Sequence, residues 1–77
     1  MPTKTIRVID VHSGDRLQGY RVVLGFYGGG MTDAQWTNGN GEAWLEVGYG
    51  RTATVYVDGD GQGDIGGYDA GLYVVRV

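Results

Sequence analysis

The chain lacks cysteine and has a single histidine among its 77 residues. Disulfides and cysteine-based metal sites are therefore excluded, and so are metal sites built from several histidines. The one histidine, His12, lies in a predicted turn beside Ser13, and neighbours in sequence do not make a catalytic triad. Because no set of nucleophile, base and orienting group can be named, we expect a protein that is not an enzyme.

Basic clusters and long apolar runs are missing as well. The net charge is −3, and the six Lys and Arg residues are scattered, without the basic patch that neutralises phosphates. The apolar runs span only a few residues, as at residues 22–24, far fewer than a membrane-spanning helix needs. The N-terminal residues lack the apolar segment of a signal peptide. The sequence thus predicts neither nucleic-acid nor membrane binding. It leaves the compartment open, and an extracellular or cell-surface parent protein fits equally well.

Glycine, in contrast, is abundant. Sixteen glycines accompany six tyrosines and two tryptophans, and these aromatic residues argue against low-complexity disorder. Such a composition predicts many turns between short strands. The length allows one domain, residues 1–77, which buries only about 60% of its extended-chain surface. The domain must therefore pack well or gain stability by associating with other copies.

Apolar residues alternate with polar ones in several short runs, which predicts six or seven β-strands. No run has a helical period, so we expect an all-β protein, a small antiparallel Greek-key sandwich. The first run alternates imperfectly, which fits either a bulge that switches faces or a strand covered on both sides. The predicted strands are 4–11, 20–27, 31–37 (a weak edge strand), 42–47, 51–57 and 72–77. The side chains expected to point inward from the best three are Tyr20, Val22, Leu24, Phe26, Ala43, Leu45, Val47, Ala53, Val55 and Val57.

The connections carry strong turn signals. Residues 38–41 (Asn-Gly-Asn-Gly) predict a tight turn, because Asn and Gly tolerate positive φ. The three glycines 28–30 predict a hairpin connection, and with no helix after them they do not form a phosphate-binding loop. Residues 58–71 form a long polar, Gly-rich segment. Ile65 and Tyr68 are expected to anchor it, with a short strand as one form of that anchor.

Three stretches together resemble a known family. They are Gly-Asp-Arg-Leu-Gln-Gly (14–19), Thr-Asn-Gly-Asn-Gly-Glu-Ala-Trp-Leu (37–45) and Ala-Thr-Val-Tyr-Val-Asp-Gly (53–59). This pattern resembles the transthyretin-like or carboxypeptidase-regulatory-like domain and its relatives among the B-type repeats of surface adhesins. The resemblance extends to Gly59 and implies a β-sandwich that serves as a noncatalytic accessory, adhesion or carrier module. Glycine-rich residues 28–30 and 59–71 depart from it.

The adhesin relatives raise one further point. In them, a Lys on the first strand bonds to an Asn or Asp on the last strand beside a catalytic acid. Lys4 with Glu42 or Glu46 would be the counterpart, but residues 72–77 contain no Asn or Asp. We therefore expect Lys4 to be an ordinary surface charge. The two glutamates lie about 13 Å apart along one strand, too far for a glycosidase pair.

The best chemical cluster is acidic. Asp58, Asp60 and Asp64 fall in the Gly-rich segment, and their carboxylates could supply oxygen ligands to calcium. The spacing fits neither an EF-hand nor a nonapeptide calcium repeat. A solvated loop in which aspartates cap turns is the competing interpretation, and the one we favour.

Aromatic side chains form the second candidate site. Trp36, Trp44, Tyr49 and Tyr56 include several rings predicted to point outward, and Tyr27 joins them. Such rings bind sugars or a protein partner when they share a face. Cross-strand ring pairing and burial in self-association are the alternatives that we favour. The sequence thus predicts a noncatalytic structural or binding module that self-associates or binds another protein. A calcium-dependent or carbohydrate-binding accessory domain is the second hypothesis.

Overall fold

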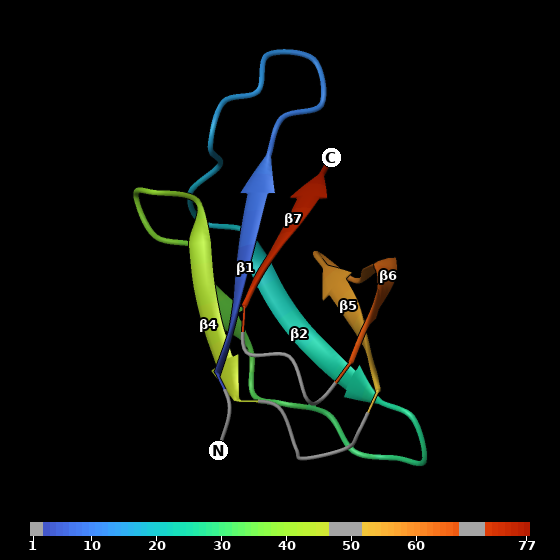
Figure 1. Ribbon diagram of the computed structural model, residues 1–77. Helices are drawn as coiled ribbons and strands as arrows, with labels where there is room; N and C mark the ends of the chain where they lie inside the picture. The colour runs from blue at the N-terminus through green and yellow to red at the C-terminus, as the bar shows by residue number, and fades with distance from the viewer. Residues whose placement is uncertain (1–2, 47–51, 67–70) are drawn as a thin grey trace.

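The computed structural model describes residues 3–46, 52–66 and 71–77, and seven strands lie within them (Figure 1). None of these residues belongs to a helix long and apolar enough to cross a membrane. The strands are β1 (Thr3–Ile9), β2 (Arg21–Phe26), β3 (Gln35–Trp36), β4 (Glu42–Glu46), β5 (Ala53–Val57), β6 (Asp60–Ile65) and β7 (Leu72–Arg76).

The strands form two sheets. One has the order β4-β1-β7, in which β1 runs antiparallel to β4 and parallel to β7. The other has the order β3-β2-β5-β6 and is antiparallel throughout. In Figure 1 the three-stranded sheet lies in front of the four-stranded sheet. The prediction of an all-β, sandwich-like fold is thereby confirmed.

The core lies between the two sheets, because alternate side chains of each strand point to the same face. Ala43 and Leu45 point inward from β4, as predicted, and β2 and β5 contribute their predicted residues as well. Tyr20 and Phe26 pack against the core while staying half-buried. Val47 lies outside the described residues. The buried core consists of Ile6, Val8, Val22, Leu24, Ala43, Leu45, Ala53, Val55, Val57, Ile65 and Val75.

The first strand is shorter than predicted. It ends at Ile9, and Val11 is 56% exposed in the turn that follows. Ile6 and Val8 point inward while Ile9 lies half-buried on the other face, so the alternation stays regular. Both sequence-based interpretations, a bulge and a doubly covered strand, are therefore wrong. The sequence pattern looks irregular because Val11 belongs to the turn and not to the strand.

The Gly-rich segment after β5 is not a long loop. Asp58 and Gly59 have φ values of 50° and 88°, the backbone of a two-residue hairpin turn. Residues 60–65 then return as β6, paired with β5, with an irregularity in register between Thr54 and Tyr56. Ile65 is buried, as expected of an anchor, whereas Tyr68 lies outside the described residues.

A tight corner joins β3 to β4 and passes the chain from one sheet to the other. The Asn38 carboxamide oxygen accepts hydrogen bonds from the backbone N–H groups of Asn40 (2.9 Å) and Glu42 (3.1 Å). The buried Thr37 hydroxyl donates to the Leu17 carbonyl (2.6 Å) and accepts from the Tyr20 N–H (2.9 Å). The predicted turn is confirmed, and Thr37 ties it to the segment that enters β2.

Candidate functional site

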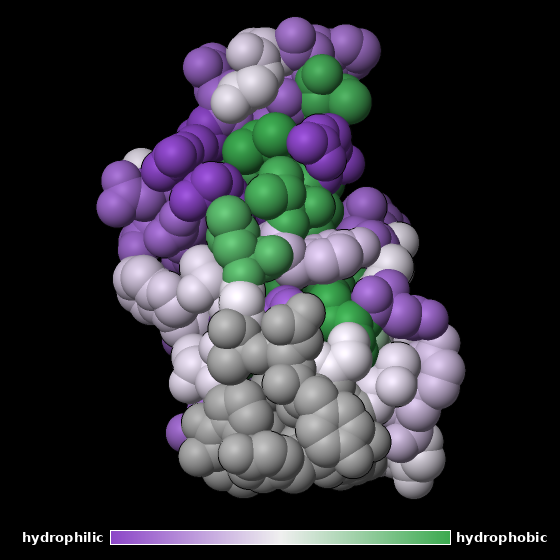
Figure 2. Space-filling view, in the orientation of Figure 1, coloured by the Kyte–Doolittle hydropathy of each residue, from purple (hydrophilic) through white to green (hydrophobic). Residues whose placement is uncertain are grey.

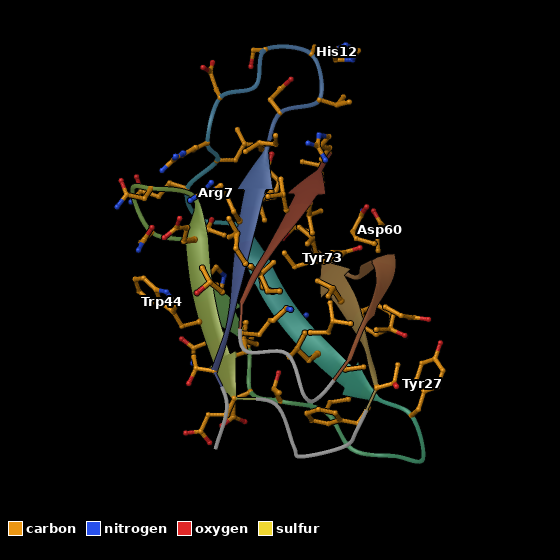
Figure 3. The ribbon with its side chains drawn as sticks, viewed as in Figure 1. Arg7, His12, Tyr27, Trp44, Asp60 and Tyr73 are labelled. Atoms are coloured by element: carbon orange, nitrogen blue, oxygen red, sulfur yellow. The ribbon has the colours of Figure 1, made fainter. Side chains whose placement is uncertain are left out.

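The structure does not bring the three candidate calcium ligands together. Asp58 lies in the β5–β6 turn, and its carboxylate accepts the Arg21 N–H at 3.0 Å. Asp60 is the first residue of β6, and Asp64 lies near the other end of this strand, about 13 Å from Asp60 along it. Figure 3 shows Asp60 at one end of β6 and Tyr27, the partner of Asp64, at the other. Within the described residues no group of three acidic, His or Cys side chains could hold a metal ion, which argues against the calcium alternative.

Asp64 instead belongs to a hydrogen-bonded group on the outer face of the four-stranded sheet. The Tyr27 hydroxyl donates to its Oδ2 at 2.5 Å, and the Thr54 hydroxyl donates to its Oδ1 at 2.8 Å. These two bonds, chiefly the one from Tyr27, lower the pKa of the Asp64 carboxyl. The same bond raises the pKa of the Tyr27 hydroxyl, because the proton is shared with a carboxylate. The group fastens the end of β2 to β6.

The candidate aromatic residues lie on opposite sides of the molecule. Trp36 pairs with Arg21 and shares the outer face of the four-stranded sheet with Tyr56. Trp44 lies on the outer face of the three-stranded sheet, and Figure 3 shows it on the side opposite Tyr27. Trp36 and Trp44 are 60% and 54% exposed. A single surface made of all four rings is therefore ruled out, and Tyr49 lies outside the described residues.

Tyr56 is a covering residue as much as an exposed one. Its ring fills the space above Gly25 and Gly61 on the flanking strands, where a Cβ at Gly25 would come within 2.8 Å of it. It also pairs with Val23, which points outward from β2 and is nevertheless buried. Tyr56 thus covers Val23 and two glycines and does not pair with another described ring, and Trp36 and Tyr27 are the exposed rings of this face. Tyr27, 57% exposed, follows directly after the end of β2.

The outer face of the three-stranded sheet joins a charged pair to an apolar band. Arg7 donates from Nε (3.0 Å) and Nη2 (2.6 Å) to Glu42 Oε2 across the β1–β4 pair. Leu72 and Val74 lie on this face in β7, and Leu72 is 48% exposed. Figure 2 shows apolar side chains gathered along β1 and β7, with hydrophilic ones toward β4. The sequence indicates only Lys4 as a partner for Glu42 on β1, whereas the structure pairs Glu42 with Arg7.

Lys4 is not a surface charge. It is only 4% exposed and shares the inner face of β1 with Ile6, because residues two apart on a strand point the same way. Glu42 and Glu46 point to the opposite, outer face, so the structure separates Lys4 from both glutamates. The expectation of ordinary surface charge is therefore wrong. The inward position was readable from the alternation with Ile6 and Val8.

The histidine turn has a structural explanation. Asp10 accepts the backbone N–H groups of His12 (2.7 Å) and Ser13 (3.0 Å), and these bonds lower the pKa of the Asp10 carboxyl. The Ser13 hydroxyl accepts the Asp15 N–H at 3.2 Å. All four residues hold the turn, and Figure 3 shows His12 at its tip, at one end of the molecule. The prediction that His12 lies in a turn is confirmed.

Four of the described strands lie at sheet edges, and three of these edges are protected. β3 has only two residues, and it contacts β4 next to the corner that joins them. β4 begins and ends with glutamate. β6 carries two aspartates, two glycines and an irregular register, all of which discourage pairing with another strand. Tyr73 also reaches across from β7 (Figure 3), and its hydroxyl donates to the Gln62 carbonyl at 3.0 Å.

The β7 edge is different. Its sequence is Leu-Tyr-Val-Val-Arg, without proline, glycine, acidic residue or bulge, and no described strand pairs with its outer side. Thr5 donates to the Gly71 carbonyl, and the Val77 N–H donates to Ile9, so Gly71 and Val77 point their backbone groups at β1. Because this direction alternates along a strand, the N–H and C=O groups of Leu72, Val74 and Arg76 point away from β1. We call these three residues the open edge.

Compared with protein-family models, curated proteins and solved structures, the chain matches none of them. The two outer faces and the open edge are thus the features from which a function can be inferred.

Proposed function

We propose that this chain is a noncatalytic structural module that associates with other copies of itself, and that the open edge carries the association. The observation behind this is the unprotected β7 strand, which presents a row of backbone donors and acceptors beside the exposed Leu72. Unpaired edges of this kind are templates for pairing with another strand. A 77-residue domain also benefits from the additional burial.

We further propose that the sandwich is a Greek key of the transthyretin-like type. Strands β2, β3 and β4 follow one another, and β5 returns to pair with β2, an order that supports a Greek key. The residues that carry the family resemblance have structural roles consistent with it. Thr37 bonds the neighbouring turn, Gly41 allows close backbone contact, and Ala43 enters the core.

Sedimentation velocity at a series of protein concentrations tests the self-association. The expected result is a sedimentation coefficient that rises with concentration as monomers combine. A single monomeric species at the highest concentration would contradict the proposal. The association should survive high salt, because the open edge holds one charge, Arg76, and depends on backbone hydrogen bonds.

Carbohydrate binding is the second candidate, and the exposure of Trp36 and Tyr27 on one outer face favours it. Exposed aromatic rings stack on the apolar faces of sugars. A glycan array tests it, with Trp36→Ala as the variant that should lose binding. Trp44→Ala is a matched control, because Trp44 is similarly exposed on the opposite side. Equal binding by both variants, or none by the unchanged protein, would remove this candidate.

A further inference from the structure

We infer that two copies of the chain pair their β7 strands antiparallel, about a two-fold axis that passes beside Val74. The pairing joins two three-stranded sheets into one continuous sheet of the order β4-β1-β7-β7-β1-β4. This inference rests on the proposed self-association and adds the partner strand, its direction and its register.

The register follows from the backbone groups of the open edge. In antiparallel sheets, a hydrogen-bonded pair consists of two opposite residues that exchange both of their N–H···O bonds. When the two-fold axis passes beside Val74, the Val74 residues of the two copies lie opposite each other. Leu72 of each copy then lies opposite Arg76 of the other. Each of the three open residues then satisfies its N–H and its C=O. If the register shifted by one residue, the open N–H and C=O groups would lie opposite residues of the second copy whose own N–H and C=O groups already point to β1.

Side chains and charge favour the same arrangement. Val74 meets Val74, an apolar β-branched pair of the kind that stabilises sheets. The two Arg76 residues are held apart at opposite ends of the junction, each beside a Leu72, so like charges do not meet. Arg76 also approaches a partner whose net charge is −3. The apolar band on the outer face continues across the junction, because Leu72 and Val74 of both copies lie on it.

A second copy is preferred over an unrelated strand because the edge is complementary to itself. One sequence supplies both sides of every pair, and two-fold symmetry closes the assembly at two chains. A junction of five residues a side buries little surface, so we expect weak, concentration-dependent association.

Single cysteines test the register, and the natural chain has none to interfere. In a hydrogen-bonded antiparallel pair the two Cα atoms lie about 5.5 Å apart, within the range that a disulfide spans. Val74→Cys should therefore form a disulfide-linked dimer under mild oxidation. Leu72→Cys and Arg76→Cys should each fail alone, because each cysteine would lie about 13 Å along the strand from its copy. A mixture of these two variants should cross-link as a heterodimer.

The expected result is that Val74→Cys cross-links at least about tenfold faster than Leu72→Cys alone, because pairing raises the local thiol concentration. Equal rates, or no cross-linked heterodimer from the mixture, would overturn the register. Sedimentation of the same variants in reductant separates the two proposals. Association without the predicted cross-links would overturn only the pairing geometry, whereas a monomer at every concentration would overturn the self-association as well. Circular dichroism checks that each variant is folded.

Discussion

At the scale of single residues, Gly41 occupies a point where three segments of backbone meet. Its φ is +72°, and a Cβ there would lie 2.9 Å from the Val8 carbonyl oxygen and 3.0 Å from the Leu17 nitrogen. Neither backbone atom can move without disturbing β1 or the turn beside it. Gly14 has a similar φ of +77°, but nothing lies within 4 Å of its Cβ position. A substitution at Gly14 therefore introduces backbone strain alone, whereas one at Gly41 introduces both strain and crowding.

We predict that Gly41→Ala lowers the free energy of unfolding by about 3 kcal/mol or more, the sum of left-handed strain and overpacking. Gly14→Ala should cost only the strain, about 1–2 kcal/mol. Urea denaturation of both variants measures the difference. Equal losses would mean that the close approach at Gly41 is not what requires glycine there.

The Tyr27–Asp64 pair gives a prediction about pH. The pKa of Asp64 is lowered from its ordinary value of 3.8, so the stability it contributes is present above that value and is lost as the pH falls through the lowered pKa. The pKa of Tyr27 is raised from 10.0, so its contribution is present below that value and is lost as the pH rises through the raised pKa. Between those limits the contact should be insensitive to pH.

Tyr27→Phe should return the pKa of Asp64 toward 3.8, because the variant lacks the Tyr27 hydrogen bond, which is the largest cause of the lowered pKa. NMR titration of the side-chain carboxyl carbons measures this. Asp10 is an internal control, since its low pKa comes from the backbone N–H groups of Ser13 and His12 and should not change. An unchanged Asp64 pKa in the variant would contradict the assigned contact.

At the scale of elements, the predictable strands are those whose environment is one-sided. β4 and β5 bury one face and expose the other, so their alternation was visible in the sequence. The sequence indicates β6 only as one possible form of the Ile65 anchor, because Asp and Gly have low strand propensity, and the strand is held by pairing with β5 instead. The Asp58-Gly59 dipeptide was the available signal for this hairpin. The separation of Trp36 from Trp44 depends on which sheet each strand joins, which alternation alone does not specify.

Tyr73 links the edge strands of the two sheets, and its hydroxyl bonds the Gln62 carbonyl. Tyr73→Phe keeps the ring and removes only this bond, so we predict a loss of about 1 kcal/mol in the free energy of unfolding. Tyr20→Phe is a suitable control, because no described residue hydrogen-bonds the Tyr20 hydroxyl while its ring packs against the same core. Thermal or urea unfolding would reveal the difference, and equal stability of the two variants would argue against a link between the sheets.

At the scale of the whole molecule, the free side of β7 decides whether the sandwich stays alone. Val74→Pro removes an N–H that points away from β1, so the fold should keep its β1–β7 ladder. We predict a folded variant whose dissociation constant rises about a hundredfold or more, because each pairing loses hydrogen bonds at its centre. Val75→Pro removes an N–H that faces β1 and should destabilise the monomer itself. Unchanged association of Val74→Pro in sedimentation velocity would contradict the proposal.

Amide hydrogen exchange along β7, followed by NMR at low and high protein concentration, tests the open edge most directly. In the monomer, the amides of Tyr73 and Val75 should exchange slowly, and those of Leu72, Val74 and Arg76 should exchange fast. At high concentration the three open-edge amides should become protected while the other two stay as they were. Val74 protected in the dilute monomer, or unprotected at every concentration, would contradict the account.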